Sequence, residues 1–79
     1  MRDQGERVTG TRDSAYDLIS VIYHALQAAE AAQTYQHDAQ QAGDQALAQL
    51  FEASQRDHRD FAERAKQLLG QRLSQSGGR

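Results

Sequence analysis

The chain contains no cysteine and no proline, and each absence excludes something. Without cysteine there is no disulfide framework, no thiolate metal site and no cysteine nucleophile. The same absence fits a reducing compartment, and we expect a cytoplasmic protein. Because proline breaks helices by removing a backbone donor, a chain without it can form long uninterrupted helices.

Long apolar segments and blocks of a single charge are also missing. The most apolar segment, "LISVIYHAL", is too short to cross a bilayer, and the first ten residues lack the apolar core of a secretory signal. Nine basic and eleven acidic side chains are scattered along 79 residues and give a net charge of −2. A nucleic-acid-binding surface needs clustered basic residues. We therefore expect neither a membrane nor a nucleic acid as partner.

Glycine is scarce between residues 12 and 69, where Gly43 is the only one. A glycine in the left-handed conformation commonly ends a helix, and Asp44 directly behind it is suited to cap the next helix. The pattern predicts an all-α fold, an antiparallel two-helix hairpin. The predicted segments are a flexible tail over 1–10, a hairpin over 11–73 and a flexible tail over 74–79. Within the hairpin we predict a helix over about 12–42 capped by Thr11, a turn at 43–44, and a helix over about 45–69, or 45–73 if Gly70 is tolerated.

Apolar residues recur at helical spacing in both predicted helices, so each helix carries one apolar stripe. The second stripe is close to heptad spacing, which is typical of helices that pack against other helices. In the first helix the stripe consists of Ala15, Leu18, Ile19, Ile22, Ala25, Leu26 and Ala29. In the second helix it consists of Leu47, Leu50, Phe51, Ser54, His58, Phe61, Ala65, Leu68 and Leu69.

A lone hairpin has a single helix-to-helix contact, and so short a chain buries a modest share of its surface on folding. Pairing with a second copy would cover the remaining apolar surface and close a four-helix bundle. Two-fold symmetry is the commonest arrangement of such a pair. We therefore expect a homo-oligomer, with a dimer favoured. The alternative is assembly onto a larger protein, to which the alanine-rich segment "HALQAAEAAQTY" would offer a close approach.

His58 falls within the second apolar stripe, where a titratable ring is either a core residue or part of a binding site. Folding about the turn places residues of equal distance from it side by side, so Glu30 and His58 should lie at one height. Tyr23 and His37 flank Glu30 at seven-residue spacing. A carboxylate, an imidazole and a phenol at one level are potential metal ligands. Glu30 and His58 are therefore the candidate metal ligands, with His37, Tyr23 and Gln55 as outer candidates.

Two segments, "YHALQAAEAAQTYQHDA" and "GDQALAQLFEASQRDHRDFAERAKQLL", are similar to short uncharacterised bacterial proteins of the ferritin-like type. The resemblance extends to the ferritin and rubrerythrin superfamily. It implies a four-helix bundle in which two helix pairs hold two iron atoms through glutamates and histidines. At the position three residues before His58, where the superfamily has a glutamate, this chain has Gln55. A neutral amide is a poor iron ligand, so the resemblance implies at most a degenerate site that holds one divalent ion loosely.

Two functional hypotheses follow. The first is a non-enzymatic, self-associating helical hairpin without a cofactor, because the sequence has no glycine-rich phosphate loop and no nucleophile paired with a base. His58 is then a neutral core histidine that is hydrogen-bonded to Glu30, to Gln55 or to a polar group of a partner chain. The second is a ferritin-like metal-binding protein, in which Glu30 and His58 bind a divalent ion across the dimer interface.

Overall fold

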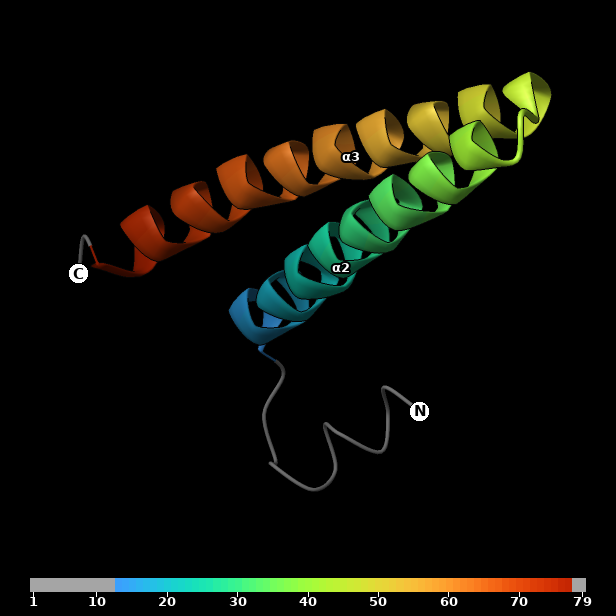
Figure 1. Ribbon diagram of the computed structural model, residues 1–79. Helices are drawn as coiled ribbons and strands as arrows, with labels where there is room; N and C mark the ends of the chain where they lie inside the picture. The colour runs from blue at the N-terminus through green and yellow to red at the C-terminus, as the bar shows by residue number, and fades with distance from the viewer. Residues whose placement is uncertain (1–12, 78–79) are drawn as a thin grey trace.

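The computed structural model describes residues 13–77, which form two α-helices packed side by side as an antiparallel hairpin (Figure 1). Helix α2 spans Ser14–Gln41 and helix α3 spans Gln45–Gly77. The predicted all-α class and the helical hairpin are therefore confirmed. The tail predicted over 1–10 and the cap predicted at Thr11 lie outside the described residues.

Helix α2 begins at a side-chain cap. Asp13 has an extended backbone, and its carboxylate oxygen Oδ1 accepts a hydrogen bond from the backbone N–H of Tyr16 at 3.1 Å. The first amides of a helix have no partner within the helix, and an aspartate at this position satisfies one of them. Within the described residues Asp13 thus caps the helix, two positions after the residue that the sequence suggested.

The turn is a three-residue connection that satisfies the end of α2 and the start of α3 together. Gly43 has a φ of +74°, its N–H donates to the carbonyl of Gln40 at 3.1 Å, and the N–H of Asp44 donates to the carbonyl of Ala39 at 2.9 Å. This pair of bonds is the Schellman motif. Asp44 then caps α3, because its Oδ1 accepts from the N–H of Leu47 at 3.1 Å.

Helix α3 continues through Gly70 and ends at Gly77, so residues 74–77 extend a helix that was predicted to end at 69 or 73. Gly70 is exposed, and a methyl group added there would meet nothing within 4 Å. A glycine inside a helix costs only about 0.5–1 kcal/mol relative to alanine. Its neighbours Gln71, Arg72 and Leu73 are good helix formers, which offset this cost.

The contact between α2 and α3 is built from alanine. We call the line of contact the seam, and its positions alternate in steps of three and four residues, as in a coiled coil. Every buried hydrophobic residue of the described chain is one of its alanines, namely Ala25, Ala29, Ala32, Ala39, Ala48, Ala62 and Ala65. The remaining seam positions, between and beyond these alanines, are the half-buried residues Leu18, Ile22, Gln36, Phe51, Gln55, His58 and Leu69.

The position of the seam corrects the predicted stripes. Ala25, Ala29 and Ala65 are buried as predicted, and Leu18, Ile22, Phe51 and Leu69 are half-buried, but the other six large hydrophobic members of the stripes are at least 39% exposed. Small side chains allow two helix axes to approach closely, and the distance between packed helices depends on the residues at the contact. The helices pack against each other mainly through their alanines. Six residues that were predicted to be in the core are therefore exposed: Ile19, Leu26, Leu47, Leu50, Phe61 and Leu68.

The hairpin is a single flat layer, with Cα extents of 54 × 28 × 13 Å. The two helices are closest near the turn and diverge toward their other ends (Figure 1). Within residues 13–77 no third element covers either broad face of this layer. Neither described helix is long and apolar enough to cross a membrane.

Substitution of the turn glycine tests the backbone argument. Gly43→Ala should lower the free energy of unfolding by about 1–2 kcal/mol, because a Cβ disfavours the left-handed conformation. Gly70→Ala is the matched control, and it should raise the free energy of unfolding by about 0.5–1 kcal/mol. Urea unfolding followed by circular dichroism at one fixed protein concentration measures both. A change of the same sign in the two variants would contradict the account of the turn.

Enlargement of a seam residue tests the alanine contact. Ala62 is 1% exposed, so Ala62→Leu should push the helices apart and lower the free energy of unfolding by about 1–3 kcal/mol. Ala46→Leu provides the control, because Ala46 is exposed on α3 and its replacement should change stability by less than about 0.5 kcal/mol. If Ala62→Leu is as stable as the parent chain, the seam does not depend on small residues.

Candidate functional site

His58 is a half-buried seam residue on α3, and its hydrogen bonds stay within its own helix. Its Nδ1 lies 2.8 Å from the backbone carbonyl oxygen of Ser54 and 3.3 Å from the Ser54 hydroxyl. With the proton on Nδ1, the ring donates to that carbonyl. The prediction that Glu30 or Gln55 would hold this ring is therefore wrong within one chain. The preceding helical turn supplies the partner because Ser54 lies four residues earlier, directly beneath the ring.

Glu30 lies near the height of His58 but on another side of α2. The register between the helices pairs residues at similar distances from the turn: the rings of Tyr35 and Phe51 are 5.5 Å apart, and Gln55 Nε2 donates to Gln36 Oε1 at 3.4 Å. Glu30, however, follows the buried Ala29 and so points about 100° away from it around the helix. It is exposed and lines a shallow hollow formed by α2 alone. One chain does not bring Glu30 and His58 together.

The outer candidates are also separated from His58. Tyr23 is exposed, packs edge-on against His24 with 5.5 Å between ring centroids, and accepts a hydrogen bond from Gln27 Nε2. His37 is exposed on α2. Gln55 is half-buried and accepts a hydrogen bond from Arg59 besides its bond to Gln36. Among residues 13–77 there is no group of three histidines or carboxylates that could hold a metal ion.

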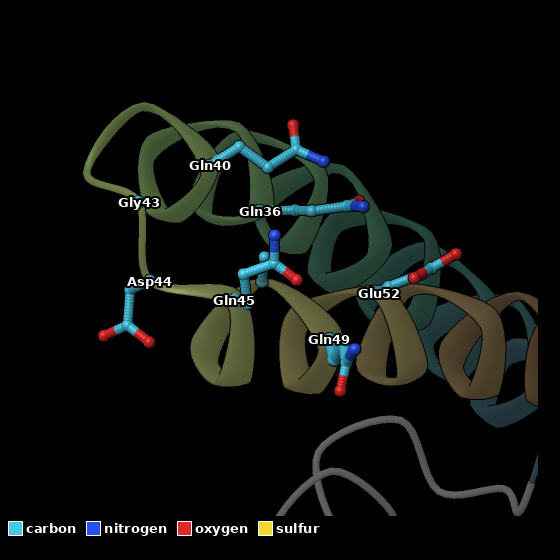
Figure 2. A pocket seen from close by; sticks show the side chains of 8 residues that line it. Gln36, Gln40, Gly43, Asp44, Gln45, Gln49 and Glu52 are labelled. Atoms are coloured by element: carbon cyan, nitrogen blue, oxygen red, sulfur yellow. The ribbon is translucent and has the colours of Figure 1, made fainter.

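A polar hollow beside the turn is another concave feature of the hairpin (Figure 2). Its walls carry four glutamines, Gln36, Gln40, Gln45 and Gln49, together with the carboxylate of Glu52. The Asp44 side chain points away from the others in this view, consistent with its role as the cap of α3. Amides offer hydrogen bonds but neither a nucleophile nor a general base at neutral pH. The carboxylates of Asp44 and Glu52 are the ionisable groups of its lining.

The most unusual feature of the surface is its apolar content. Eleven large hydrophobic side chains of the described residues are exposed by 38–66%. Most of them can be assigned to one of the two broad faces of the hairpin from their position relative to the seam. In an antiparallel pair of helices, the residues that directly precede seam positions lie on one broad face, and those that directly follow seam positions lie on the other. Two sets result. The Phe61 face comprises Val21, Tyr35, Leu47, Leu50, Phe61 and Leu68, and the Ile19 stripe comprises Tyr16, Ile19, Tyr23 and Leu26.

A hollow between the helices supports this assignment. It is lined from α2 by Val21, His24, Ala25 and Ala28, and from α3 by Asp57, His58, Phe61 and Arg64. The members other than Ala25 and His58 each directly precede a seam residue, so the two helices present one common face here. The sequence held the signal for this face in the heptad series Leu47, Leu50, Ser54, Asp57, Phe61, Arg64 and Leu68, which runs beside the alanine series.

The chain matches no family model, no curated protein and no solved structure. The resemblance to ferritin-like proteins thus remains a prediction from the sequence.

Replacement of the seam histidine separates the two roles proposed for it. His58→Leu should change the free energy of unfolding by less than about 1 kcal/mol, because one modest hydrogen bond is exchanged for apolar packing. Urea unfolding measures this change. Elemental analysis of the native protein, purified without chelators, should find no stoichiometric iron, zinc or manganese. Bound metal that disappears in His58→Leu would establish a ligand role instead.

Proposed function

We propose that this chain is a small non-enzymatic protein whose hairpin associates with a second copy of itself, forming a two-fold dimer with the architecture of a four-helix bundle. The observation that carries the proposal is an inversion of the usual core. Alanine occupies the buried positions, whereas large hydrophobic residues occupy exposed ones. Large aliphatic and aromatic residues are usually inside folded proteins.

The amount of exposed apolar surface supports an interface. Six side chains on the Phe61 face, each about half exposed, present roughly 500 Å² of largely apolar surface if a whole large side chain contributes about 150–250 Å². That is near the upper range for the largest apolar patch of a monomer, roughly 300–600 Å², and such patches mark interaction sites. With its polar rim, the face approaches the roughly 800 Å² that each partner of a standard interface buries.

The weakness of the seam points in the same direction. Burial of apolar surface stabilises by about 25 cal/mol per Å², so a methyl group contributes much less than a leucine side chain. No large side chain of the described residues is fully buried within one chain. A second copy would supply the missing burial, because it would cover one broad face of each hairpin.

The described residues favour an interaction role over catalysis. They include no buried polar or charged side chain, so no titratable group lies in a dry environment that would activate it. Ferritin-like metal binding has weaker support, since Glu30 and His58 lie on different sides of the hairpin and a second chain would have to complete the site. We therefore place self-association first.

Association should be visible as a concentration dependence. Because a dimer is favoured by mass action, the thermal unfolding midpoint should rise as the protein concentration is increased, and sedimentation equilibrium should give twice the 8.8 kDa mass of the chain. Guanidinium-unfolded protein serves as the monomer reference. A folded chain that stays monomeric, with a midpoint independent of concentration, would refute self-association.

A further inference from the structure

We infer that the second copy docks on the Phe61 face, antiparallel to the first, about a two-fold axis that crosses near Leu26 on α2 and Arg59 on α3. This inference rests on the proposed self-association and adds to it the face, the register and the charge pairs. The two broad faces are not equivalent, and the difference between them selects the occupied one.

The Phe61 face is apolar on both helices. Val21 and Tyr35 lie on its α2 side, and Leu47, Leu50, Phe61 and Leu68 lie on its α3 side. The opposite face carries the Ile19 stripe on α2 only. Between Gln49 and Lys66 its α3 side consists of residues that directly follow seam positions and are polar and exposed, such as Glu52 and Arg59, and Leu73, 53% exposed, lies beyond them. A partner on that face would have to desolvate charges without burying apolar surface on this stretch of α3.

Two exposed leucines of α3 are placed symmetrically about Arg59. Leu50 and Leu68 lie nine residues to either side of it, and both belong to the stripe of the Phe61 face. In an antiparallel self-pairing, residues equidistant from the axis face each other. Leu50 of each copy therefore lies opposite the partner's Leu68. The two Phe61 rings lie about 6 Å apart along the helix direction, one on each side of the two-fold axis.

The charges on the stripe are complementary in the same register. Asp57 lies opposite the partner's Phe61, and Arg64 begins three residues, about 4.5 Å, beyond Phe61 along the helix. The guanidinium of Arg64 thus reaches the carboxylate of the partner's Asp57, and symmetry doubles the pair. Within one chain Arg64 lies over its own Phe61 ring at 5.5 Å, and neither Asp57 nor Arg64 forms a salt bridge inside the described part of the chain.

Helix α2 supports the same axis independently. Leu26 lies at the height of Arg59, since the hollow between the helices brings His24 and Ala28 to the level of Phe61 and Asp57. About Leu26, His24 pairs with the partner's Ala28, and Val21 pairs with the partner's Ala31. Each contact joins a larger side chain to an alanine, so α2 of both copies can approach without a clash. One axis therefore satisfies both helices.

Sedimentation equilibrium of the full chain and of surface variants tests the face. Leu50→Ser and Leu68→Ser should each weaken dimerisation by about tenfold or more, because two buried leucines are lost per dimer. Ile19→Ser is the matched control, since Ile19 is 52% exposed and Leu50 62%, and it should change the dissociation constant by less than about twofold. These residues are exposed in the hairpin, and retained helical circular dichroism verifies folding.

Charge exchange tests the ion pairs and does not depend on apolar burial. Asp57→Lys and Arg64→Glu should each weaken dimerisation about three- to tenfold, because like charges then meet across the axis. The double variant Asp57→Lys/Arg64→Glu should return to within about twofold of the parent chain, since the pairs re-form with exchanged signs. Additive weakening in the double variant would overturn the register.

Cysteine cross-linking tests the register directly, because the chain has no cysteine of its own. Positions 50 and 68 are roughly 27 Å apart along one helix, so a disulfide between them can form only between copies. Leu50→Cys/Leu68→Cys should oxidise to a covalent dimer, whereas Ile19→Cys/Leu26→Cys should not. If the parent chain dimerises but only the Ile19 variants disturb it, the proposed function stands and this face is wrong. If the parent chain is monomeric, both fail.

Discussion

Contact between alanines is the constraint on which the rest of this hairpin depends. Each helix has apolar residues on more than one side, and its orientation about its own axis decides which of them are buried. Methyl groups at steps of three and four residues allow the helix backbones to approach, and Ala29 and Ala62 are the most buried residues of the contact, at 2% and 1% exposed. Four larger hydrophobic side chains are half-buried in the seam, and most of the others lie along its edges. Packing through alanines therefore holds the two helices together and also leaves many of their large hydrophobic residues exposed to water.

The course of the chain follows from single residues. Gly43 takes the left-handed conformation at the one place where the chain reverses, and Asp44 caps the second helix, because few other residue types satisfy these local requirements. The end of α3 was harder to predict. Gly70 is the same residue type as Gly43 but lies in helical conformation, and the difference arises from its neighbours rather than from glycine itself.

Which side of each helix packs against the other helix was predicted less well, for a physical reason. Weighting residues by hydrophobicity places Leu26, Leu50 and Phe61 in the core, whereas the packing of two helices alone favours small residues at the contact. Because the helices pack through their alanines, the two candidate metal ligands point in different directions. Glu30 and His58 do lie at similar heights, as equal distance from the turn requires, but Glu30 points away from α3 and His58 bonds to Ser54. The position of a residue along a helix follows directly from its place in the sequence. The direction in which it points around the helix depends on which of several apolar stripes packs against the other helix.

The short connection between α2 and α3 also has a consequence for how the hairpin forms. Contacts close to the bend, such as that between the rings of Tyr35 and Phe51, join segments separated by few residues, so little chain entropy is lost in closing them. Each later contact lies one turn further out and requires only a small additional closure. Folding should therefore proceed as a zipper from the Gly43 end, with the rapid kinetics of proteins whose contacts are local. The diverging ends would close last, so fraying in the native state should begin there.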